Sequence, residues 1–286
     1  MKTRTLILKT LLVAALLGMA VLVPACAKKG VALRFNYIKG KEFKYHLVSK
    51  VTTRMATDNT VNKYLIEIDM VVRAVIQSIK KNGDAEMAFT YEKISYINSQ
   101  EPEKSVETIK KLKNAQLFIT LTPYGEIVDF KGLEDLPHME IEDFNLFKIL
   151  MKAHPIFPYS AIPIGKKWDR QQEFPIENAL IKGNMLAYKR FVIMDTIGPV
   201  AKINSEITMK FDLPEQKNFS LQADEGERLG FFGNGNINFD INRGEMIDAK
   251  AYVFGKMILT LKHPVTGDPL VTRIETTQNI DLAIEQ

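Results

Sequence analysis

Residues 64–79, YLIEIDMVVRAVIQSI, alternate between apolar and polar side chains. A period of two is typical of a long β-strand with one buried face, because successive side chains of a strand point to opposite sides. The turn signal KNGD at 81–84 follows, and 85–94 begins a returning strand, as in a β-hairpin. With further strand signals along the chain, this predicts a mainly β fold: a curved antiparallel sheet or open half-barrel with one or two short helices covering it.

The first 25 residues have the layout of a signal peptide. Three basic residues precede residues 10–23, an uncharged and mostly apolar run that is too short to span a bilayer. Pro24 ends this run, and Ala25 precedes Cys26. The arrangement resembles the lipobox of bacterial lipoproteins, in which cleavage before a cysteine is followed by transfer of a diacylglyceryl group to its thiol. Ordinary secretion, with Ala25-Cys26-Ala27 as the cleavage site, is the alternative. The three basic residues are Lys2, Arg4 and Lys9.

Cys26 is the only cysteine in the chain, so an exported domain has no internal disulfide and must be stabilised by its core. A lone thiol directly after the leader is what lipidation needs, and two or three acyl chains anchor a protein stably where one does not. We therefore expect Cys26 to be lipidated, palmitate included, with residues 26–31 as a short tether. Ala27 and Lys28 follow it, without an aspartate. By resemblance to Gram-negative sorting, this favours the outer membrane, facing the periplasm.

The net charge of the chain is +4, and the leader accounts for three of these charges, so the mature chain is near +1. No basic stripe with interleaved aromatic residues remains. We therefore expect no nucleic-acid partner.

One five-residue phrase occurs twice, as GEIVD at 125–129 and GEMID at 244–248. Other features recur in the same order, and their offset drifts only from 125 to 119 residues. They are the glycines Gly40 and Gly165, the aromatic residues Phe43 and Trp168, and the strand-like runs 72–79 and 188–197. We predict an internal duplication in which the two phrases mark the same turn, their acids capping a solvent-facing edge.

The predicted organisation has five parts. Residues 1–25 are the lipoprotein signal peptide, and 26–31 are the lipidated cysteine and tether. Residues 32–131 form a first β unit, 132–159 a helical connector, and 160–286 a second β unit with a C-terminal hairpin.

Several elements are predicted within these parts. We expect a first strand at 33–37, a solvated surface helix at 105–114, and a helix at 142–152 whose broad apolar face covers the sheet as a lid. The C-terminal hairpin pairs 252–261 with 270–284. The last strand carries charges on one face, which favours an edge position.

After the lipobox, the motifs KGKEFKY, LTPYGEIVDFKG, FPYSAIPIGKKW and INRGEMID occur in that order. This order is similar to that of a family of uncharacterised bacterial lipoproteins. A looser similarity, of architecture alone, is to the lipoprotein-localisation carriers, which fold an antiparallel sheet into an unclosed barrel with helices over its mouth. That resemblance implies binding of acyl chains, and it assigns no individual ligand-binding residue.

A search for catalytic chemistry gives a negative answer. The four histidines lack the spacing of a zinc site, and no G-x-S-x-G nucleophile elbow occurs. The glycine-rich stretch 230–235 is typical of the start of a hairpin. We therefore predict no enzyme, no catalytic residue, no metal and no cofactor. The histidines are His46, His138, His154 and His263.

Three functions remain open. The first is a membrane-anchored, non-catalytic envelope lipoprotein that binds or carries a hydrophobic ligand such as lipid or acyl chains. The second is a structural lipoprotein that docks an envelope protein. The third is a hydrolase that uses a carboxylate pair, either Asp240 with Asp248 or Glu126 with Glu245.

Overall fold

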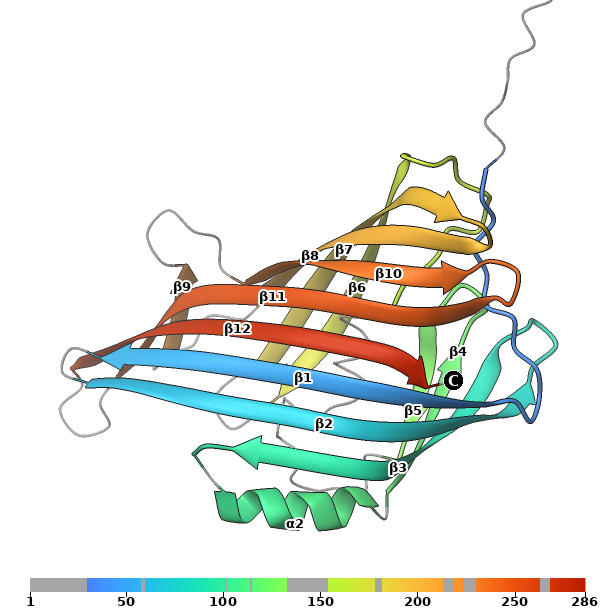
Figure 1. Ribbon diagram of the computed structural model, residues 1–286. Helices are drawn as coiled ribbons and strands as arrows, with labels where there is room; N and C mark the ends of the chain where they lie inside the picture. Colours follow the sequence, from blue (N-terminus) through green and yellow to red (C-terminus); the bar gives the residue numbers. More distant parts are fainter. Residues whose placement is uncertain are drawn as a thin grey trace, which may run out of the picture.

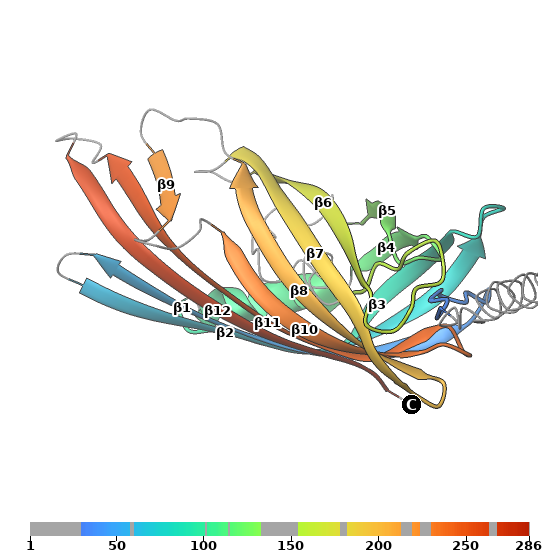
Figure 2. The ribbon, with the colours of Figure 1, turned by 90° about the horizontal axis from the view of Figure 1, so that it is seen from above.

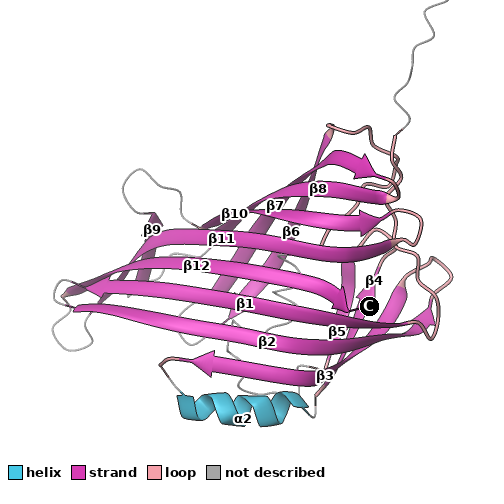
Figure 3. Ribbon diagram, viewed as in Figure 1, coloured by secondary structure: helices cyan, strands magenta, loops and turns pink. Residues whose placement is uncertain are grey.

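The computed structural model describes residues 30–57, 60–100, 102–113, 115–132, 154–177, 182–212, 219–223, 230–262 and 268–285. Within them the fold is mainly β, a twelve-stranded antiparallel sheet (Figures 1 and 3). The only helix in these described ranges is α2 (Pro102–Lys113). Figure 2 shows the sheet curving into an open half-barrel. The predicted curved, open antiparallel sheet is confirmed.

The strands follow one another in a simple order along the chain. Their bounds are β1 (Glu42–Thr57), β2 (Thr60–Ile79), β3 (Ala85–Asn98), β4 (Gln116–Leu121), β5 (Ile127–Lys131), β6 (Lys167–Glu177), β7 (Lys182–Ile197), β8 (Val200–Asp212), β9 (Phe219–Ala223), β10 (Phe231–Asp240), β11 (Glu245–Lys262) and β12 (Pro269–Glu285). In space the order is β5-β4-β3-β2-β1-β12-β11-β10-β8-β7-β6, and β9 pairs with β11 beyond the end of β10.

This order contains two five-stranded meanders, β1 to β5 and β6-β7-β8-β10-β11, with β12 between them. In each meander the connection between the third and fourth strands contains an additional element, α2 in the first meander and β9 in the second. The GEIVD phrase ends the β4–β5 turn and enters β5, and GEMID ends the β10–β11 turn and enters β11. The two phrases therefore occupy equivalent places in the meanders. Whether a gene duplication produced them, with the unit boundaries given above, stays a prediction.

The turns at Gly40 and Gly165, which precede the first strand of each meander, have the same backbone conformation. The amide of Gly40 donates to the carbonyl of Ile76 at 2.9 Å, and that of Gly165 donates to Ile193 at 2.9 Å. Both glycines are in the left-handed region, at φ of 80° and 81°. Each turn thus leads into the first strand of its meander and is hydrogen-bonded to the second strand.

The two faces of the sheet differ in polarity because side chains alternate along every strand. One cross-strand ladder is apolar and buried over seven strands, with exposures of 3% or less. Shifting each strand by one residue gives a ladder of mostly polar and charged side chains. The apolar ladder is Met70, Leu47, Leu282, Ala249, Ile237, Ile203 and Ile193; the other is Asp69, Val48, Asp281, Lys250, Asn236, Asn204 and Val192. The concave face therefore holds the core, and the convex face is wet.

The alternating segment 64–79 forms most of β2, and its turn at 81–84 leads into β3, so this predicted hairpin is confirmed. The C-terminal hairpin is confirmed as β11 and β12. The predicted edge position of the last strand is wrong, because β12 lies between β1 and β11 in the middle of the sheet. Its charges face opposite charges on those neighbours, as in Arg54–Glu275 at 3.8 Å and Lys250–Asp281 at 2.9 Å.

The helix predicted at 105–114 is present as α2, which packs against β3 with Leu112 fully buried while Val106 stays exposed. The strand predicted at 33–37 is wrong: this segment joins no ladder of the sheet. Instead its backbone reaches the turns between strands, as described below. The helix predicted at 142–152 lies outside the described residues.

Candidate functional site

Two irregular segments, 31–37 and 154–162, are held at one end of the half-barrel. They meet each other through the bridge between Val31 and Ile162. Segment 31–37 also joins the two repeated turns, because consecutive amides donate to both. Phe35 N donates to Pro123 O at 2.8 Å, and Asn36 N donates to Gly244 O at 3.0 Å. Segment 154–162 is fixed in the same way, with Phe157 N donating to Tyr124 O at 2.8 Å.

Aromatic side chains from these segments fill this end. The ring of Phe35 stacks on His154 at 4.9 Å and on Phe157 at 5.2 Å, and it meets Phe239 edge-on at 5.3 Å. Phe157 and Phe239 are fully buried. The pocket beside them, lined in part by Tyr45, has a volume of about 20 Å³. That is room for about one water molecule, so the described side chains at this end are tightly packed.

Polar side chains of β6 and β7 hold segment 154–162 against the concave face. Trp168 Nε1 donates to the carbonyl of Ile156 at 2.9 Å, Arg170 Nη2 to that of Phe157 at 2.7 Å, and Lys189 Nζ to that of His154 at 3.2 Å. Burial lowers the pKa of Lys189 to about 7. Burial, and then the charge of Lys189, lowers the pKa of His154 to about 3. Lys189 therefore supports the packed end by hydrogen bonding and is only partly charged in neutral solution, whereas the buried imidazole of His154 is neutral there.

The end of the concave face opposite the packed end carries half-buried aliphatic, methionine and threonine side chains. Two adjacent ladders there place Thr53 opposite Thr276 and Met55 opposite Ile274. The two hydroxyls are 3.2 Å apart and hydrogen-bonded, which satisfies them within the sheet. Next to them Ile66 faces the same side, and Met55, Ile66 and Ile274 are only half-buried. This surface, which we name the distal trough, comprises Thr53, Met55, Ile66, Thr276, Ile274 and Met257.

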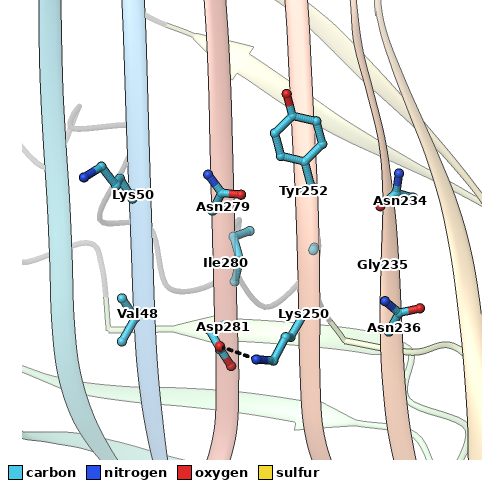
Figure 4. Close-up of a pocket in the computed structure, with 11 residues that line it drawn as sticks. Val48, Lys50, Asn234, Gly235, Asn236, Lys250, Tyr252, Asn279, Ile280 and Asp281 are labelled. Carbon is cyan, nitrogen blue, oxygen red and sulfur yellow. Dashed lines mark ion pairs between the residues drawn. The ribbon is translucent and has the colours of Figure 1, made fainter.

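The convex face carries shallow hollows of another character. Figure 4 shows one of about 290 Å³, with Lys50, Asn279 and Tyr252 toward the viewer and Ile280 on the opposite side of the sheet. Lys250 and Asp281 form an ion pair across it. A larger hollow of about 620 Å³ lies over β7, β8 and β10. Both are open, and apolar side chains such as Val48 and Met194 lie among their amides and charges, so neither is an enclosed apolar site.

The carboxylates predicted as possible hydrolase pairs each have a hydrogen-bond donor or a cation as their partner. Asp248 accepts from the amide of Asn238 at 2.9 Å, and Glu126 accepts from the hydroxyl of Tyr159 at 3.0 Å. Glu245 is buried, with Lys41 and Arg243 as its ion partners. The expectation that the acids of both phrases cap a solvent-facing edge is therefore wrong for Glu245.

Asp240 Oδ1 accepts from the amide of Arg243 at 2.9 Å, so it closes the turn before Gly244. Among the histidines within the described ranges, His46 contacts Asp69 at 2.8 Å on the outer surface, and His154 lies in the packed end. His138, His263 and the lipidation candidate Cys26 lie outside the described residues. No group of three or more metal-ligating side chains occurs in the part of the chain that the structure describes.

Sequence reasoning assigned no part to Lys189, Arg170 or the segment 154–157. One signal was available, since the alternation of β7 places Lys189 on the same face as Ala187 and Phe191. No comparable signal marked segment 154–157, which is short, apolar and bounded by prolines, and has no period.

Comparison with known proteins adds little to this geometry. No protein-family model and no curated protein matches the chain. Among solved structures, DynF from the dynemicin biosynthesis pathway of Micromonospora chersina matches with 11% identity and a TM-score of 0.21. The match covers 89% of this chain and 85% of that one. At that TM-score it carries no functional argument, and the resemblance to a lipoprotein family stays a prediction. Within the described residues, no helix is long and apolar enough to cross a membrane.

Proposed function

We propose that the chain is a non-catalytic lipoprotein of the bacterial cell envelope, anchored by acyl chains on Cys26, which binds a hydrophobic ligand such as an acyl chain in the distal trough. The observation that carries the ligand proposal is the half-burial of Met55, Ile66 and Ile274 on the concave side of an open sheet. At the packed end the same face is covered by the aromatic rings of Phe35, Phe157 and Phe239.

The chemistry of the distal trough suits a flexible apolar chain. Methionine is unbranched and polarisable, so Met55 and Met257 can adapt to ligands of different shape. The hydroxyl pair of the trough, Thr53 with Thr276, is hydrogen-bonded internally and offers little to a polar ligand. Each methylene of an acyl chain that is buried there gains about 0.8 kcal/mol.

The proposal is tested by placing charge on either face of the same strands. Met55→Glu with Ile274→Glu puts a carboxylate pair into the distal trough, because these residues are cross-strand neighbours. The matched control is Ala56→Glu with Arg273→Glu, the next cross-strand pair, which lies on the convex face. Both double variants introduce two carboxylates at neighbouring cross-strand positions of β1 and β12, and the control also removes the positive charge of Arg273, so it disturbs the sheet at least as much.

Binding is measured with parinaric acid, a fluorescent fatty acid, on the lipidated full chain in detergent. We expect saturable binding to the unmodified protein and to the control, and loss of binding to the trough variant. Native mass spectrometry of the purified protein should also find co-purified lipid beyond the covalent anchor. Equal binding by the two variants, or no binding by the unmodified protein, would refute the ligand proposal.

A further inference from the structure

Six connections between elements lie at the packed end of the half-barrel, where segment 31–37 also lies (Figures 1 and 2). Four of them carry an exposed isoleucine. Ile38 and Ile164 precede the first strands of the two meanders, and Ile79 and Ile197 end the second strands. Their exposed fractions are 54%, 42%, 40% and 56%. A large apolar side chain in water at one such tip is unremarkable, but here one pair lies at the equivalent tips of each meander.

Three of the four tips, those at Ile38, Ile79 and Ile164, also carry positive charge. Lys39, Lys80, Lys81 and Lys166 are all exposed, and each lies within two residues of one of the four isoleucines. Of the acids nearby, Asp84 is buried in its turn, and Asp195 is exposed. Glu42 is exposed as well, and it forms an ion pair with Arg73. The combination of apolar tips and flanking lysines suits a membrane surface, since lysine keeps its ammonium among headgroups while its stem covers apolar surface.

The tether decides which end faces the membrane. The first paired residue after the leader is Val31, which exchanges hydrogen bonds of 2.8 and 3.0 Å with Ile162. Ile162 is two residues before the tip at Ile164. Five residues from Cys26 to Val31 can span at most about 18 Å. An acylated Cys26 therefore holds these tips close to the bilayer.

We infer that the surface formed by Ile38, Ile79, Ile164, Ile197 and their flanking lysines inserts into the headgroup region of an anionic membrane. The strands then point away from the bilayer, and the distal trough faces the aqueous side. This inference rests on the lipid anchor of the proposed function, and it adds an orientation that an anchor alone does not fix. A flexible tether without this surface would leave the domain free to tumble.

The experiment measures the depth of single positions in the lipidated full chain. Cys26 is the only native cysteine and acylation consumes its thiol, so a new cysteine can be labelled alone. Ile38→Cys, Ile79→Cys, Ile164→Cys and Ile197→Cys are labelled with an environment-sensitive nitrobenzoxadiazole dye. Val61→Cys and Leu270→Cys are matched controls, because these residues are 54% and 49% exposed and lie at the opposite end of the sheet.

The labelled proteins are reconstituted into phosphatidylcholine vesicles with phosphatidylglycerol, and nitroxide lipids with shallow spin labels serve as quenchers. We expect blue-shifted emission and quenching at the four isoleucine positions, and neither at the two controls. Replacing Lys39, Lys80, Lys81 and Lys166 by glutamine should weaken the response to phosphatidylglycerol, by up to about fivefold per lysine.

Equal quenching at both ends of the sheet, or no quenching at the isoleucine positions, would overturn the inference. The mass of the N-terminal peptide from the same samples separates the two proposals. Acylated protein with unquenched labels overturns the orientation and leaves the anchor standing. A peptide without acyl groups overturns the anchor and the orientation together.

Discussion

The strongest quantitative prediction concerns the two repeated turns. Gly125 and Gly244 are in the left-handed region, at φ of 87° and 66°, and both face the segments that fill the packed end. A Cβ on Gly125 would lie 2.3 Å from the carbonyl oxygen of Pro155. One on Gly244 would lie 2.6 Å from the backbone nitrogen of Asn36. Backbone atoms cannot move aside cheaply, so alanine at either position should disturb how segments 31–37 and 154–162 pack.

Gly40 and Gly165 are matched controls within the same molecule. Their φ values are 80° and 81°, and a Cβ on either would meet no atom within 4 Å. Alanine there costs the left-handed conformation alone, about 1–2 kcal/mol. At Gly125 or Gly244 a steric cost of about 1–3 kcal/mol is added, as for overpacked cores. We therefore expect Gly125→Ala and Gly244→Ala to lower the free energy of unfolding by about 2–5 kcal/mol.

The assay is urea unfolding followed by the fluorescence of Trp168, which is the only tryptophan and is 7% exposed. Its indole nitrogen is bonded to Ile156, so it also reports release of segment 154–162. Each variant is compared with the unmodified chain at fixed pH. Equal losses of stability in Gly40→Ala and Gly125→Ala would refute the reasoning, because they would show that the turn does not pack against its neighbours.

Three further substitutions test the packed end and the anchor. Burial lowers the pKa of His154 to about 3, so between pH 6.5 and 3 the unfolded chain binds a proton that the folded chain does not bind. The free energy of unfolding therefore falls by up to about 1.4 kcal/mol for each pH unit of acidification. His154→Gln should reduce this slope in urea midpoints measured between pH 7 and 4, and an unchanged slope would contradict the reasoning. Phe157→Ala removes a fully buried ring and should cost about 3–5 kcal/mol in the same assay, whereas a loss below about 1 kcal/mol would show that the aromatic cluster is not tightly packed. Cys26→Ser should abolish acylation, measured as the mass of the N-terminal peptide and as loss of the protein from sedimented membranes; retention of the variant in the membrane would contradict the anchor.

Strand periodicity in the sequence was a reliable guide to the sheet, because half-buried strands must alternate. Residues 64–79 show this directly, and β2 buries Ile68, Met70 and Val72 on the predicted face. The position of β12 was not predictable in the same way. Its charges look like those of an exposed edge until the facing residues Arg54 and Lys250 are known. One strand's sequence reports which of its faces is wet, and it does not report which strands lie beside it.

The irregular segments show a second limit. The burial of segment 154–157 depends on donors from β6 and β7, such as Arg170 and Lys189, which are bonded to its carbonyls. A periodic signal arises only when a segment is regular, and these backbone groups are satisfied by side chains more than ten residues away. The same reason explains the wrong strand at 33–37, where an extended backbone bonds to turns and not to a neighbouring strand.

The proposed ligand site and the proposed membrane surface constrain each other. If the isoleucine tips face the bilayer, the packed end lies between the membrane and the distal trough. Its pocket of about 20 Å³ beside Phe35 and Tyr45 is far too small for an acyl chain to pass. A ligand would therefore enter from the aqueous end, where the distal trough lies. This arrangement suits exchange with a partner in the aqueous compartment better than direct extraction from the membrane to which the protein is anchored.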